Sequence, residues 1–76
     1  DYGKAALWYS KAAEQGHADA QYNLGLCFHH AQGVKQDLIK AVEWISKAAE
    51  QGHDRAQLTF GICYYVGRGI KQDLVK

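Results

Sequence analysis

The sequence carries the heptapeptide KAAEQGH twice, at residues 11–17 and again at residues 47–53. The same spacing of 36 residues holds along the chain, because placing residues 1–40 over residues 37–76 gives 22 identities in 40 positions. Other pairs at this spacing share a distinctive residue type: Trp8 and Trp44, Gly25 and Gly61, Cys27 and Cys63. A fixed period of about 20–50 residues is typical of repeat proteins, whose units bury apolar faces against their neighbours. The period therefore predicts a repeat architecture.

Within one period, the segment from Asp37 to Gly52 has the pattern of an amphipathic helix. Its apolar residues recur at helical spacing on one face: Leu38, Ala41, Val42, Ile45, Ala48 and Ala49. Asp37 can accept hydrogen bonds from the free N–H groups of the first turn. Gly52 can take the left-handed conformation that ends a helix. The segment from Asp1 to Gly16 is the same helix one period earlier.

The other segment of the period, over residues 18–31, is also predicted to be helical. Its apolar set is Ala20, Leu24, Cys27, Phe28 and Ala31. Gly25 lies inside this helix, and Gly61 lies at the same place in the second copy. A repeated mid-helix glycine indicates close approach of a neighbouring helix, which outweighs its propensity cost of about 1 kcal/mol. A loop follows over residues 32–36, with Gly33 as its turn residue.

These patterns predict an all-α protein, an α-solenoid of antiparallel helix pairs that winds into a right-handed superhelix. The four expected helices alternate between two types, helix B and helix A, near residues 3–15 (B), 18–31 (A), 38–51 (B) and 54–66 (A). The chain divides into helix B of one repeat, one full repeat and an incomplete repeat: residues 1–16, 17–52 and 53–76. Six apolar residues are expected in the core: Ala20, Leu24, Cys27, Ala41, Ile45 and Ala48.

Composition excludes several functions. A chain of 76 residues allows one small domain, and its formal net charge of +1 gives no broad electrostatic reason to bind nucleic acid. The longest apolar stretches are a few residues long, so we expect no insertion into a membrane. Two cysteines are too few for a disulfide framework. What remains is a helical module that binds another protein or spaces other domains.

The residues that recur in both copies resemble the Sel-one-like repeat (SLR), a relative of the tetratricopeptide repeat. The resemblance rests on short motifs spread over the period: Ala20-Gln21, Leu24-Gly25, Gly33-Val34, Asp37, Lys40-Ala41, Trp44 and Lys47-Ala48-Ala49. The second copy departs from them mildly, with Phe60 for leucine and Ile70 for valine. Some bacterial SLR proteins carry a disulfide in each repeat, but its cysteine positions fall on Ala13 and Gln21 here. The resemblance implies a superhelical adaptor or scaffold without catalytic residues.

In tetratricopeptide-like arrays helix A lines the concave groove, so the resemblance implies that partners bind there. Five positions of helix A differ between the two copies and are spaced for one helical face. We call this surface the helix A face: Asp19, Tyr22, Leu26, His29, His30, Arg55, Leu58, Ile62, Tyr65 and Val66. Its mixture of aromatic, aliphatic and charged residues suits a protein or peptide partner. The alternative is drift at solvated positions together with contacts to neighbouring repeats.

Metal binding and catalysis find little support in the residues. His29 and His30 are adjacent in a helix and should point about 100° apart, whereas zinc sites need three or four convergent ligands. Cys27 and Cys63 occupy equivalent positions and are expected to be small buried hydrophobes rather than nucleophiles. We therefore expect no enzyme activity, no cofactor and no metal. Trp44 and its equivalent Trp8 are expected to pack between repeats.

Three functions remain to be weighed. The first is an adaptor or scaffold segment that binds a protein or peptide on the helix A face. The second is a purely structural spacer, and the third, remote, is a metal-binding or enzymatic domain. Helical arrays need about three repeats for stability, so we expect these residues to be a piece of a longer protein. We then expect the isolated piece to associate end to end through two apolar helix faces. One face carries Leu7, Trp8 and Tyr9, and the other carries Ile62, Tyr65 and Val66.

Overall fold

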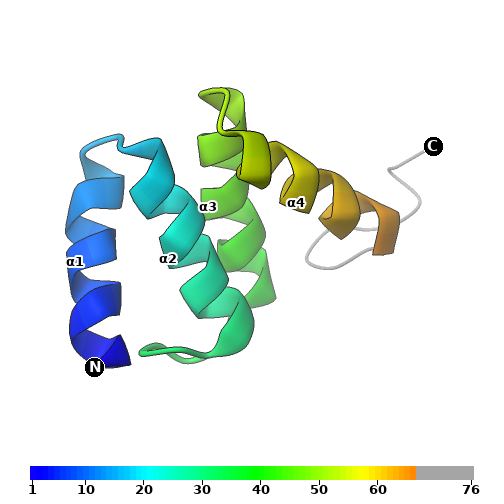
Figure 1. The fold of residues 1–76 in the computed structure, drawn as a ribbon. Helices are drawn as coiled ribbons and strands as arrows, with labels where there is room; N and C mark the ends of the chain where they lie inside the picture. Colours follow the sequence, from blue (N-terminus) through cyan, green and yellow to red (C-terminus); the bar gives the residue numbers. More distant parts are fainter. Residues whose placement is uncertain (67–76) are drawn as a thin grey trace.

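The computed structural model describes residues 1–66, which form a row of helices (Figure 1). The helices are α1 (Tyr2–Glu14), α2 (Ala18–His30), α3 (Leu38–Glu50) and α4 (Asp54–Val66). Their bounds agree with the predicted ones to within one residue at each end, and residues 1–66 contain no strand. Helices α1 and α3 are therefore the predicted B helices, and α2 and α4 the A helices.

The helices pack as antiparallel neighbours in chain order. In Figure 1, α1, α2 and α3 lie side by side, and α4 leans away from α3 toward the C-terminal end. Helix α2 contacts both α1 and α3, and α3 contacts α4. This arrangement confirms the all-α fold with antiparallel helix pairs, whereas the right-handed superhelix stays a prediction.

The residues at the helix ends explain where the helices begin and end. Asp37 caps α3, because its carboxylate Oδ1 accepts a hydrogen bond of 3.0 Å from the backbone N–H of Lys40. Gly52 follows α3 with φ of +88°, as its predicted role in ending that helix requires. The prediction that Ala31 belongs to the apolar stripe was wrong. Helix α2 ends at His30, and Ala31 is its exposed C-cap, with a left-handed φ of 56°.

The core consists of two clusters that join neighbouring helices. One contains Ala13, Ala20 and Leu24, and the other contains Ile45, Ala48 and Ala56. All six residues predicted to be buried are buried. Because four of these six side chains are alanine methyl groups, the helices can approach closely at the two clusters.

Gly25 shows how close that approach is. A Cβ atom placed on Gly25 would lie 2.5 Å from Ile45 Cγ1 and 3.0 Å from the carbonyl oxygen of Ala41. The predicted close approach is therefore confirmed between α2 and α3. At Gly61, by contrast, no described atom lies within 4 Å of such a Cβ atom.

Glutamine side chains tie the start of each A helix to the end of the preceding B helix. The amide nitrogen of Gln21 donates to the carbonyl oxygen of Ala13 at 3.2 Å, and that of Gln57 donates to Ala49 at the same distance. Gln21 is buried, and its amide oxygen accepts from Gln51 at 2.7 Å. Buried polar groups are normally paired, and these bonds pair the amide of Gln21, whereas Gln57 makes the equivalent bond at an exposed position.

Candidate protein-binding surfaces

Residues of the helix A face line two different hollows. Asp19, Tyr22 and Arg55 line a polar hollow of about 360 Å³ beside the start of α4. Leu58 and Tyr65 are exposed on α4. They line neither this hollow nor the apolar hollow between α2, α3 and α4. The side chain of Val66 lies outside the described part of the chain. Of the ten residues, the polar hollow therefore brings together Asp19, Tyr22 and Arg55.

His53 joins Asp19 and Tyr22 to the first turn of α4. Its Nδ1 accepts a hydrogen bond of 3.1 Å from the backbone N–H of Ala56. The ring proton of the neutral imidazole must then lie on Nε2, which donates to Asp19 Oδ1 at 2.6 Å. The ring also stacks on Tyr22, with centroids 4.9 Å apart. This link between successive repeats was not predicted from the sequence.

Tyr22 has a second contact across the two A helices. Its hydroxyl lies 3.5 Å from Thr59 Oγ1, and the side chain is half-buried. Tyr22 therefore takes part in packing between repeats, and only the remaining exposed part of its ring can meet a partner.

An apolar hollow of about 320 Å³ lies between α2, α3 and α4. It brings together four residues of the predicted helix A face: Leu26, His29, His30 and Ile62. Ile45, Thr59 and Cys63 complete its lining. The hollow thus combines aliphatic side chains with two imidazoles that can donate or accept hydrogen bonds.

His29 and His30 do not point apart as expected. Their rings meet edge to face with centroids 4.6 Å apart, and the two Nδ1 atoms lie 3.4 Å from each other. The helical spacing predicted divergent Cβ atoms, but side-chain rotation brings the rings back together. Among residues 1–66, no group of three or more His, Cys, Asp or Glu side chains could hold a metal ion.

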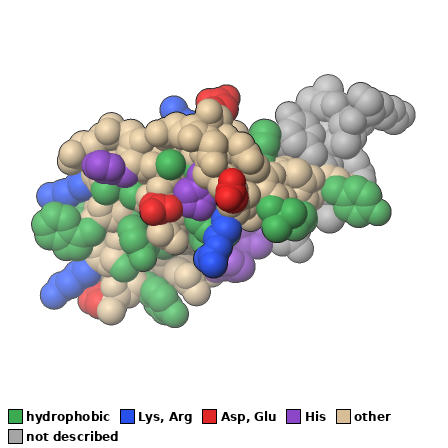
Figure 2. Space-filling view, turned by 45° about the horizontal axis from the view of Figure 1, so that its top comes forward, with side chains coloured by type: hydrophobic (Ala, Val, Ile, Leu, Met, Phe, Trp, Pro, Cys, Tyr) green, Lys and Arg blue, Asp and Glu red, His purple; other side chains and the backbone are tan. Residues whose placement is uncertain are grey.

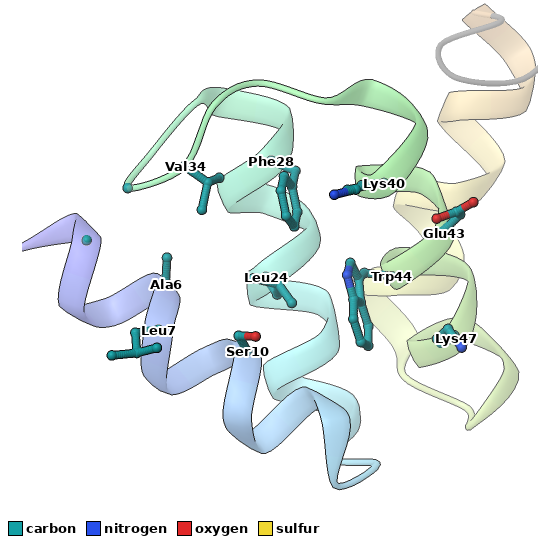
Figure 3. Close-up of a pocket in the computed structure, with 12 residues that line it drawn as sticks. Ala6, Leu7, Ser10, Leu24, Phe28, Val34, Lys40, Glu43, Trp44 and Lys47 are labelled. Carbon is teal, nitrogen blue, oxygen red and sulfur yellow. The ribbon is translucent and has the colours of Figure 1, made fainter.

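A larger hollow, of about 650 Å³, lies between the two B helices and was not predicted (Figure 3). We call it the outer groove. One wall comes from α1, at Gly3, Ala6, Leu7 and Ser10, and the other from α3, at Lys40, Glu43, Trp44 and Lys47. Leu24 and Phe28 of α2 lie between the walls, and Val34 of the following loop lines one end (Figure 3).

The tryptophans behave differently in the two B helices. Trp44 is half-buried and packs against the cluster of Ala13, Ala20 and Leu24, which confirms its predicted role between repeats. Trp8 is 65% exposed, so that role is not seen for it within residues 1–66. Each ring has a lysine ammonium near its face, Lys11 over Trp8 at 5.0 Å and Lys47 over Trp44 at 5.6 Å. The repeated spacing Lys-x3-Trp-x2-Lys is the sequence signal that could have pointed to the outer groove.

Both cysteines are buried, as predicted. Burial raises the pKa of the Cys27 thiol, because desolvation disfavours the thiolate. A nucleophilic or redox-active cysteine needs the opposite shift.

Charged side chains of both signs lie among hydrophobic ones in the view of Figure 2, so no field of a single sign covers that face.

Comparison with known proteins identifies the family. The Sel1 repeat model matches residues 1–17, 18–53 and 56–76, so the chain belongs to the Sel1 repeat family, as the resemblance indicated. The chain is 48% identical over 40 residues to the rat and mouse proteins named DAP3-binding cell death enhancer 1. That match covers 53% of this chain and 8% of those proteins.

Two solved structures are similar throughout. One is c5321, a protective antigen of uropathogenic Escherichia coli strains with an SLR fold, at TM-score 0.92 and 45% identity. The other is a Sel1 repeat protein from Oxalobacter formigenes, at TM-score 0.88 and 43% identity. The matches cover 93% and 91% of this chain but only 15% and 28% of those proteins. Within the described residues, no helix has the length and apolar character needed to cross a bilayer.

Proposed function

We propose that this chain is a protein-interaction segment, an adaptor or scaffold piece that binds a protein or peptide through the helix A face. Sel1 repeat domains are typically protein-interaction modules, and the chain belongs to that family. We further propose that the segment is not an enzyme. The raised pKa of the buried Cys27 thiol supports this, since it keeps that thiol protonated and weakly nucleophilic at neutral pH.

The observation that carries the binding proposal is the apolar hollow between α2 and α4. Interface energy is concentrated where a few side chains fill well-packed pockets. Leu26 and Ile62 supply an aliphatic lining that can hold such an anchor, and His30 supplies a polar group at the same hollow. We therefore expect Leu26, His29, His30 and Ile62 to contribute most of the binding energy, with Arg55 and Leu58 at the edge.

The link through His53 favours the alternative function, a structural spacer. Asp19 and Tyr22 are engaged in contacts between repeats, which fix the second A helix relative to the first. A spacer needs only such contacts and no partner. The two functions differ in whether substitutions at the apolar hollow change the affinity for a ligand without changing the fold.

A peptide selection decides between them. Peptides selected from a random library against the chain are tested for binding to Ile62→Ala and His30→Ala variants. Both residues are exposed, so the circular dichroism spectrum should not change. We expect each variant to weaken binding about fivefold or more, equivalent to about 1 kcal/mol.

The matched control is Glu50→Ala, which changes an exposed residue on α3 away from the apolar hollow. It should leave the affinity unchanged. Failure to select any peptide whose affinity depends on Ile62 or His30 would support the spacer.

A further inference from the structure

We propose that the outer groove is a second binding surface, and that it takes a peptide segment with an apolar side chain flanked by carboxylates. The outer groove lies between α1 and α3, whereas the apolar hollow on the helix A face lies between α2, α3 and α4. The two share no lining residue, so the second surface does not depend on the function proposed above. It is also the larger of the two, at about 650 Å³ against about 320 Å³.

The base of the outer groove suits an apolar side chain. Leu24 is almost fully buried there, and the ring of Phe28 and the isopropyl group of Val34 extend the apolar lining toward the loop (Figure 3). On the α1 wall, Leu7 is 54% exposed, and the other lining residues of that wall are small: Gly3, Ala6 and Ser10. Covering Leu7 and the exposed part of Trp44 would remove apolar surface from water, which is the main driving force for association.

Charge complementarity identifies the partner as acidic. The ammonium group of Lys40 lies 5.6 Å from the centre of the Phe28 ring and points across the groove, and Lys47 lies over Trp44 (Figure 3). Neither ammonium has a carboxylate within 4.0 Å in the part of the chain that the structure describes. Glu43 is the one acidic residue among the lining residues, and the α1 wall adds none.

The position of these lysines strengthens the argument. Both lysines are exposed, and the aromatic rings beneath them favour positions of the ammonium groups at the groove, so a carboxylate that reaches them gains a charge-assisted hydrogen bond. The partner's apolar side chain would contact Leu7 and Phe28 while its carboxylates meet Lys40 and Lys47. The binding should therefore weaken as the salt concentration rises.

Lys40 has a matched control elsewhere in the chain. Lys4 occupies the same repeat position in α1 but does not line the outer groove. Lysine to glutamate changes at both positions alter the net charge equally. Both positions are in the first turn behind an aspartate cap, where an acidic residue is favourable for a helix. Neither Lys40→Glu nor Lys4→Glu should therefore unfold the protein.

The test is a selection from a random 12-residue peptide library against the unmodified chain, with counter-selection on the Lys40→Glu variant. We expect the retained peptides to be rich in glutamate and aspartate around an aliphatic or aromatic residue. Their affinity, measured by fluorescence anisotropy, should fall about tenfold or more in Lys40→Glu and stay within about twofold in Lys4→Glu.

Three results would overturn the proposal. The first is that no peptide survives counter-selection. The second is that the retained peptides carry no excess of acidic residues. The third is equal weakening by Lys4→Glu and Lys40→Glu, which would show only a general attraction between charges. Binding of the chain to phosphatidylserine vesicles that depends on Lys40, without any retained peptide, would assign the groove to a lipid surface instead.

Discussion

The close contact between α2 and α3 at Gly25 gives a prediction with an internal control. In Gly25→Ala, the added methyl carbon would lie 2.5 Å from Ile45 Cγ1, closer than carbon atoms can approach, and 3.0 Å from a backbone oxygen. Ile45 is only 1% exposed and belongs to a core cluster, so a shift of its side chain would disturb the packing around it. Overpacking of this kind costs about 1–3 kcal/mol.

The same substitution also brings a gain, because alanine in a helix interior is about 1 kcal/mol more favourable than glycine. The difference between these two terms is a net loss of up to about 2 kcal/mol at Gly25, where the clash involves a buried side chain and backbone. In Gly61→Ala only the gain remains, because no described atom lies within 4 Å of the new methyl group. This variant should be more stable by about 0.5–1 kcal/mol.

Urea unfolding followed by far-ultraviolet circular dichroism measures both changes. A double variant adds a further check, because Ile45→Ala removes most of the atoms that the new methyl group would meet. Gly25→Ala should therefore cost less in the Ile45→Ala background than in the unmodified chain. If Gly25→Ala stabilises the protein as Gly61→Ala does, α2 and α3 do not pack as closely as described here.

Three further predictions concern the core, the thiol and the exposed apolar residues of α1 and α4. Ile45→Ala should lower the free energy of unfolding by about 2–5 kcal/mol, and a loss near zero in denaturant unfolding would mean that Ile45 faces solvent. Burial raises the pKa of the Cys27 thiol in the folded state, so the contribution of this thiol to stability is present below pH 9 and is lost as the pH rises further. The free energy of unfolding should therefore fall less above pH 9 in Cys27→Ala than in the unmodified chain. An equal fall in both proteins would contradict the raised pKa. Exposed apolar residues on α1 and α4, including Trp8 at 65% and Leu58 at 68%, should cause the chain to self-associate; sedimentation that shows a monomer at every concentration would contradict this.

The fold was largely predictable from the sequence because its determinants are local and repeated. The 36-residue period gave the helix bounds, and Asp37 and Gly52 marked helix ends through cap chemistry that involves few residues. Ala31 was misplaced because an apolar residue at helical spacing can equally take the left-handed C-cap position. Spacing alone does not distinguish these two roles.

The candidate sites were less predictable, because they depend on where side chains from different helices meet. The spacing of His29 and His30 suggested divergence, yet their rings are in contact. The hydrogen bond from His53 to Asp19 joins residues 34 positions apart in the sequence. Predicting it would require the angle between the repeats, which the sequence pattern does not encode. The outer groove depends on the gap between α1 and α3, which no local pattern encodes. Only its repeated lysine–tryptophan spacing was visible beforehand.

The central claim, that the chain binds a protein partner through the helix A face, is tested most directly by amide chemical-shift mapping. The isotope-labelled Lys40→Glu variant, in which the outer groove no longer favours an acidic peptide, is titrated with a peptide selected against that variant. The largest shifts should cluster at Leu26, His29, His30 and Ile62, around the apolar hollow of α2, α3 and α4. Saturable binding whose shifts are confined to the B helices, with those residues unchanged, would contradict the claim.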